Sequence, residues 1–156
     1  MPTLSFRRAA FFRLGILAAF MLALGGCGER SVDALTDIAL NGAASEQEKA
    51  ALELADRGPA AIFPFRRILA ESKSPGVRAI AIQALGNLGD LQSMPALLDA
   101  MDDADPQVRS RAGVAASKLL HSDFRFRTED PLAKRKAIIG QMREAYDQLV
   151  MRRLVK

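Results

Sequence analysis

The 156-residue sequence is poor in the residues that most often build catalytic, redox and metal sites. It has one cysteine, one histidine and no tryptophan. A single cysteine excludes an intramolecular disulfide, and a single histidine excludes a cluster of imidazole ligands. His121 has only Asp123 as a carboxylate close in sequence, and no nucleophile or further ligand accompanies it. We therefore expect no catalytic site, no metal site and no enzyme activity, and we expect His121 to lie at a helix end.

Long hydrophobic runs are also scarce. The apolar run Leu14–Leu24 has eleven residues, whereas a helix needs about 20 to span a bilayer. Three arginines (Arg7, Arg8 and Arg13) precede this run, and two glycines follow it. A positive start, a short apolar stretch and small residues are typical of a secretory signal peptide. We therefore predict an export leader at residues 1–26 and no permanent transmembrane helix there.

The four residues Leu24-Gly25-Gly26-Cys27 follow the apolar run directly. They resemble the lipobox of bacterial lipoproteins: an apolar residue, two small residues and a cysteine. The resemblance implies cleavage before Cys27 and a thioether-linked diacylglycerol on its sulfur, usually with acylation of the new N-terminus. Each buried acyl methylene adds roughly 0.8 kcal/mol, so two or three chains hold firmly. We expect no cofactor beyond this covalent lipid.

The lipoprotein interpretation also implies a location. Gly28 stands where an aspartate would signal inner-membrane retention in enteric-type bacteria, so we expect the outer membrane, with the protein facing the periplasm. Two alternatives stay open. One is an ordinary signal peptide with a chance cysteine, and the other is twin-arginine export through Arg7-Arg8.

Removing the leader changes the charge balance. The full chain has a net charge of +4, and its leader holds three arginines and no acid, so the mature chain is close to neutral. A high pI therefore gives no support for nucleic-acid binding, and we expect none. The remaining charge is uneven, with net −3 over residues 27–122 and net +4 over 123–156. The basic end could meet phospholipid or an acidic partner, or form a solvated helix face.

A repeat occupies the middle of the chain. Residues 74–78 (SPGVR) and 105–109 (DPQVR) lie 31 residues apart, and alanines and a leucine recur downstream at the same shift. Ser74 and Asp105 are typical N-cap residues, and a proline suits the first helical position that follows each of them. A degenerate earlier copy begins with Ser45 and Glu48, which have the spacing of a capping box.

These signals predict about seven helices. We expect a cap helix near 31–40, hairpins that join 45–55 to 60–70 and 74–88 to 93–101, a third repeat helix from 106, and a capping helix from Asp130-Pro131 to about 154. The fold class is therefore all-α. Terminal helices are expected to cap the stack, because no single unit buries its apolar face alone.

The run P-x-V-R…A-x-x-A-L-G-x-L-G-D, clearest over 74–120, resembles HEAT-type repeats, and the short bacterial variety grouped with phycobilin-lyase repeats most closely. The resemblance implies a short right-handed superhelix of helical hairpins. It also implies that Arg78 and Arg109 form a structural ladder with acidic residues between repeats. The candidate partners are Asp90, Asp102, Asp103 and Asp105.

In such folds the second helix of each unit usually lines the concave face. With the hairpins assigned above, these helices are 60–70 and 93–101, which makes Arg66, Arg67 and Asp99 candidate contact residues. The expected organisation is a cleaved leader (1–26), a lipidated tether (27–30), a repeat stack (31–122), and a loop with a basic capping helix (123–156).

We expect a non-catalytic module that is held on the bilayer by its acyl chains and binds another protein. One alternative is a structural envelope protein whose basic C-terminal helix touches anionic lipid. A third possibility, an enzyme that resembles phycobilin lyases, fits poorly with an export leader.

Overall fold

The computed structural model describes residues 29–154, so the predicted leader and Cys27 lie outside the described residues. The described part contains seven α-helices, two short 3-10 helices and no strand. The α-helices are α2 (Val32–Asn41), α3 (Ala44–Ala55), α4 (Ile62–Glu71), α5 (Pro75–Asn87), α6 (Met94–Ala100), α7 (Pro106–Leu120) and α8 (Leu132–Leu154). The 3-10 helices η1 (Gly58–Ala61) and η2 (Leu91–Ser93) precede α4 and α6. The all-α prediction is confirmed.

The two strongest helix starts are capped as predicted. The Ser74 hydroxyl accepts a hydrogen bond from the Val77 N–H, and the Asp105 carboxylate accepts from the N–H groups of Gln107 and Val108. Each cap is followed by a proline in the first turn, where the missing N–H removes no hydrogen bond. The repeated sequence therefore encodes the same helix start twice.

The predicted capping box is wrong. α3 begins at Ala44, one residue before Ser45, and its N-cap residue Ala43 provides no side-chain hydrogen bond. The Glu48 carboxylate instead lies against Gly76, where an added Cβ would come within 1.9 Å of Glu48 Oε1. This position is the first turn of α5, where the helix dipole favours an anion. Glu48 therefore contacts the start of α5 and does not cap α3, the helix to which it belongs.

The helices pair differently from the prediction. α2 packs extensively on α3, α4 on α5, and α6 on α7. The predicted pairs, α3 with α4 and α5 with α6, share little packing. The 31-residue period fixes the length of the repeated unit but not the residue at which a unit begins. α2 is therefore the first helix of a hairpin and not a separate cap.

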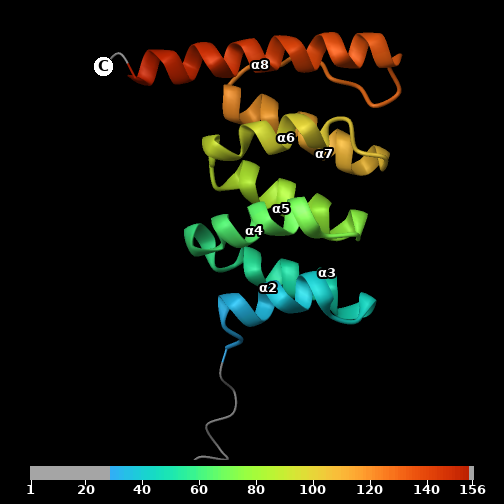
Figure 1. Ribbon diagram of the computed structural model, residues 1–156, viewed down its shortest axis with the longest axis vertical. Helices are drawn as coiled ribbons and strands as arrows, with labels where there is room; N and C mark the ends of the chain where they lie inside the picture. The colour runs from blue at the N-terminus through green and yellow to red at the C-terminus, as the bar shows by residue number, and fades with distance from the viewer. Residues whose placement is uncertain (1–28, 155–156) are drawn as a thin grey trace, which may run out of the picture. The chain divides into compact units, whose positions relative to one another are not determined.

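The hairpins stack into two layers (Figure 1). α3, α5 and α7 form one layer, α2, α4 and α6 form the other, and α8 packs on both α6 and α7. α5 and α7 pack closely, since an added Cβ on Gly86 would lie 2.8 Å from the Ala115 Cβ. α4 and α6 pack far less extensively.

A continuous core of small and aliphatic side chains lies between the layers. Phe65, Leu85, Leu97 and Met142 are completely buried within it. Met142 belongs to α8, whose one buried stripe covers the end of the stack. Within residues 29–154, no helix is both long and apolar enough to cross a membrane.

Candidate functional site

Two arginines link successive hairpins through paired hydrogen bonds to carboxylates. Arg78 on α5 donates to both Asp103 oxygens, at 2.9 and 2.8 Å, and to the Ser72 carbonyl at 3.0 Å. Arg66 on α4 donates to both Asp90 oxygens, at 2.8 and 2.5 Å. Paired bonds from a planar guanidinium fix orientation as well as charge. We call these two pairs the arginine ladder.

The ladder carboxylates are largely covered by protein. Burial acts to raise the pKa of Asp90, but hydrogen bonds from Arg66 and Ser93 outweigh it and hold the pKa below its ordinary value. Burial also acts to raise the pKa of Asp103, but hydrogen bonds from Arg78 and from the backbone of Asp105 outweigh it and hold this pKa below its ordinary value. Both carboxylates are therefore ionised in the folded protein at neutral pH, and each neutralises the arginine that it binds.

Arg109 occupies the same repeat position as Arg78 but bonds differently. Its guanidinium donates to the backbone carbonyls of Asp103 and Ala104, at 2.8 and 2.9 Å. Asp105, one of the four candidate partners, caps α7 instead. Of the remaining candidates, Asp103 bonds Arg78 and Asp90 bonds Arg66. Asp102 lies on the surface, 3.8 Å from Arg135 of α8.

The surface between α5 and α7 carries cations of another kind. A shallow groove of about 360 Å³ separates α5 from α7, and its walls include Gln83, Asn87, Arg111, Val114 and Lys118. Arg111 donates to the Gln83 side-chain oxygen, and Lys118 Nζ donates to the Asn87 side-chain oxygen at 2.8 Å. Within residues 29–154, neither cation makes an ion pair.

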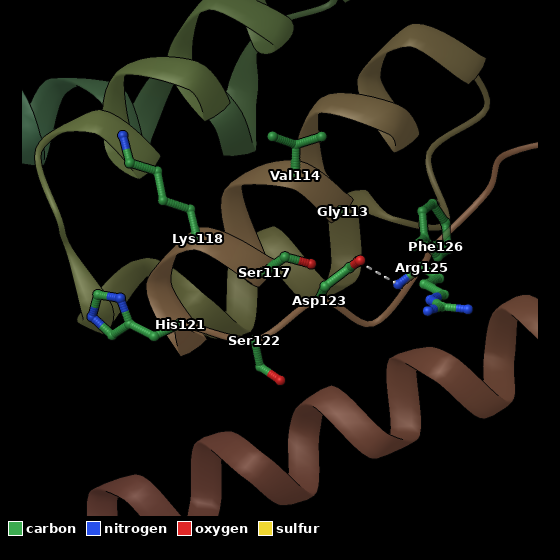
Figure 2. Close-up of a pocket in the computed structure, with 9 residues that line it drawn as sticks. All are labelled: Gly113, Val114, Ser117, Lys118, His121, Ser122, Asp123, Arg125 and Phe126. Atoms are coloured by element: carbon green, nitrogen blue, oxygen red, sulfur yellow. Dashed lines mark hydrogen bonds between the residues drawn. The ribbon is translucent and has the colours of Figure 1, made fainter.

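A second hollow, of about 580 Å³, continues from this groove past the end of α7. Val114 and Lys118 line both hollows, and the loop after α7 adds His121, Arg125 and Phe126. Figure 2 shows Val114 and Lys118 projecting from the same side of α7. We call the two hollows together the α5–α7 groove.

The loop in this groove has a constrained backbone. Among residues 29–154, the non-glycine residues with positive φ are His121 and Arg125, both at 51°, and both line the groove. The left-handed conformation costs an L-residue roughly 1–2 kcal/mol, so other contacts must hold it. The Asp123 carboxylate accepts from the Arg125 N–H at 2.9 Å (Figure 2). The Phe126 ring packs on Gly113, where an added Cβ would lie 2.6 Å from ring atom Cδ1.

Helical hairpins with a proline at the repeated helix start, joined by an arginine ladder, can be compared with known protein families. Residues 32–118, more than half of the chain, match the family of HEAT repeats. This chain belongs to the HEAT repeat family. No curated protein and no solved structure matches it. The matched range begins at the start of α2, which agrees with α2 being the first helix of a repeat hairpin.

The HEAT stack separates the three predicted contact residues. Arg66 is held by Asp90 in the arginine ladder and lies 5.3 Å from the centre of the Phe63 ring. Arg67 is exposed and pairs with Glu71 one turn away, and Asp99 is exposed 3.5 Å from Arg143 of α8. Each of the three side chains therefore has its own partner within the protein, and no hydrogen bond or ion pair among the described residues joins them.

The layer that carries the groove also differs from the expected one. Because the hairpins begin with α2, α4 and α6, their second helices are α3, α5 and α7. This favours α5 and α7, rather than residues 60–70 and 93–101, as the inner layer. In the described part of the chain, no three histidine, cysteine or acidic residues are grouped so that they could hold a metal ion.

The groove residues were not among those predicted from the sequence. Arg111, Val114 and Lys118 follow helical spacing on α7, which is also the pattern of an ordinary solvated face. Their partners Gln83 and Asn87 lie 28 and 31 residues earlier in the chain. The 31-residue period could have aligned Asn87 with Lys118, because a HEAT stack brings equivalent positions side by side.

Proposed function

We propose that this HEAT-repeat protein is a lipid-anchored, non-catalytic scaffold that binds a partner protein at the periplasmic face of the outer membrane. HEAT repeats typically mediate binding between proteins, and the family match over residues 32–118 is the observation that carries the scaffold role. The anchor rests on the lipobox-like run that ends at Cys27. The compact unit begins at Ser31, so residues 27–30 would form a short tether.

The anchor is tested by labelling cells with a radioactive fatty acid. We expect label on the wild-type protein and none on Cys27→Ser. A matched control, Gly28→Ser, alters the next residue, keeps the thiol and should retain the label. Mass spectrometry should find a mature N-terminus at Cys27. Label that persists in Cys27→Ser would contradict the proposal.

The scaffold role is tested by photo-crosslinking in cells. A crosslinking amino acid replaces Val114 in the α5–α7 groove or Phe63 on α4, both of which are exposed. We expect one discrete protein adduct from one of these faces, and loss of that adduct when surface residues around the crosslinker are altered. Absence of a discrete adduct from both faces would count against a scaffold.

The alternative envelope role, in which the basic end touches anionic lipid, draws on α8. Lys136, Arg152 and Arg153 are exposed on it, but Lys134 pairs with Asp130, and Arg135 is mostly covered beside Asp102. Salt-sensitive binding to anionic vesicles that is lost when Lys134, Arg135 and Lys136 are neutralised would favour this role over the scaffold.

A further inference from the structure

We infer that the α5–α7 groove binds an extended acidic segment of the partner protein, with carboxylates about three residues apart. This inference rests on the proposed scaffold function and specifies the chemistry of its partner. It comes from how the groove holds its cations, how those cations are spaced, and how the adjoining loop is fixed.

The groove cations are positioned without being neutralised. Arg111 is held by the Gln83 amide oxygen and Lys118 by the Asn87 amide oxygen. A neutral amide oxygen orients a cation but leaves its full charge for a second acceptor, whereas the ladder carboxylates neutralise Arg66 and Arg78. Three positive side chains (Arg111, Lys118 and Arg125) line the groove with one carboxylate, Asp123. The surface is therefore complementary to an anionic ligand.

The spacing of the cations favours an extended peptide. Arg111 and Lys118 are seven residues apart on one helix, which is about 10.5 Å along its axis. A peptide extended in the polyproline II conformation has three residues per turn and rises about 3.1 Å per residue, so side chains three residues apart point to the same side and lie about 9 Å apart. Val114 lies between the two cations on the same helix face, and its side chain is 69% exposed. An apolar side chain between two acidic residues of the peptide would cover it.

The loop at the end of the groove is fixed before any ligand binds. Asp123 binds the backbone of Arg125, and Phe126 packs on Gly113. Binding to a fixed surface loses less conformational entropy than binding to a mobile one. Arg125 lines this end of the groove and adds a third positive residue to it.

Fluorescence anisotropy tests the inference on the full-length protein in nonionic detergent. The probe is a labelled peptide with glutamate at every third position and leucines between, and its glutamine counterpart is the peptide control. We expect Arg111→Glu/Lys118→Glu to raise the Kd about tenfold or more, because each reversal replaces attraction with repulsion. The matched variant Arg67→Glu/Lys73→Glu changes net charge equally, away from the groove, and should alter the Kd less than about twofold.

Three results would overturn the inference. One is no binding by the wild type, and another is equal weakening by both charge-reversed variants, which indicates non-specific attraction. The third is displacement of the labelled peptide by phosphatidylglycerol in mixed detergent micelles at a lower concentration than unlabelled peptide, or self-association of the wild type that Arg111→Glu/Lys118→Glu abolishes. A discrete crosslink from Phe63 with no peptide binding would refute the groove and keep the scaffold. Loss of both crosslinks would refute the scaffold itself.

Discussion

The arginine ladder and the α5–α7 groove use the same kind of cation in two ways. In the ladder, Arg66 and Arg78 each bind both oxygens of a mostly covered carboxylate. In the groove, Arg111 and Lys118 bind amide oxygens at the surface. The atom that each cation binds therefore distinguishes the two roles. A cation bound to a carboxylate joins two hairpins, whereas a cation bound to an amide oxygen stays available to a ligand. If this distinction holds, ladder variants change stability and groove variants change binding.

The largest effect on stability is expected from Asp90→Ala. Asp90 is 9% exposed and binds Arg66 and Ser93, so its removal leaves a half-buried guanidinium without its carboxylate. We expect a loss of about 2–3 kcal/mol in the free energy of unfolding. Urea denaturation followed by circular dichroism measures it.

The control for Asp90→Ala removes an exposed aspartate. Asp99 lies 3.5 Å from Arg143, and its side chain is 77% exposed, so Asp99→Ala should cost less than about 0.5 kcal/mol. If Asp90→Ala and Asp99→Ala lowered the free energy of unfolding equally, a ladder carboxylate would contribute no more than a surface carboxylate.

A smaller effect is expected from the close approach that forms the groove floor. A Cβ at Gly86 would lie 2.8 Å from the Ala115 Cβ, which is attached to a packed helix and cannot move alone. Gly86→Ala should therefore separate α5 from α7 and destabilise the protein by about 1–2 kcal/mol. The midpoint of urea unfolding reports this change.

Gly140 provides the matched control, because it also lies within a helix but has no atom within 4 Å of an added Cβ. Gly140→Ala should stabilise the protein by about 0.5–1 kcal/mol, the usual gain when alanine replaces a helical glycine. If Gly86→Ala stabilised the protein, α5 and α7 would be able to move apart at little cost in free energy.

Local features of this fold were predictable from the sequence. Ser74 and Asp105 cap their helices through bonds to residues two or three positions away, so a short stretch of sequence determines the result. The HEAT resemblance implied a structural ladder at Arg78 and Arg109, and of the two only Arg78 binds a carboxylate among the described residues. Helix pairing was not predictable, because a period of 31 residues is the same wherever the unit begins.

The groove could not be predicted from the sequence, because it is formed by contacts between side chains of two different helices. Arg111 has the pattern of a solvated residue until Gln83 of α5 lies beside it. The closeness of α5 and α7 depends on Gly86 meeting Ala115, two residues with no sequence signal that joins them. Contacts of this kind are set by tertiary packing and not by local preference.

The smallest expected effect is a dependence of stability on pH that the ladder produces. The folded pKa values of Asp90 and Asp103 lie below their ordinary values. A lowered pKa gives stability that is complete above the unfolded pKa and is lost as the pH falls through the folded pKa. The ladder should therefore contribute fully above the ordinary aspartate pKa of 3.8 and progressively less as the pH falls through the lower pKa of the folded state.

Two double variants, unfolded in urea across this pH range, separate the ladder from the groove. Asp90→Asn/Asp103→Asn should be less stable than wild type at neutral pH, with a gap that narrows on acidification, because asparagine does not titrate. Gln83→Ala/Asn87→Ala should keep the wild-type acid dependence, since the amides that hold Arg111 and Lys118 carry no proton equilibrium in this range. If the stability of Gln83→Ala/Asn87→Ala no longer depended on acid pH, the ladder could not be the source of the acid dependence of the wild type. The groove cations would then have to be coupled to a carboxylate.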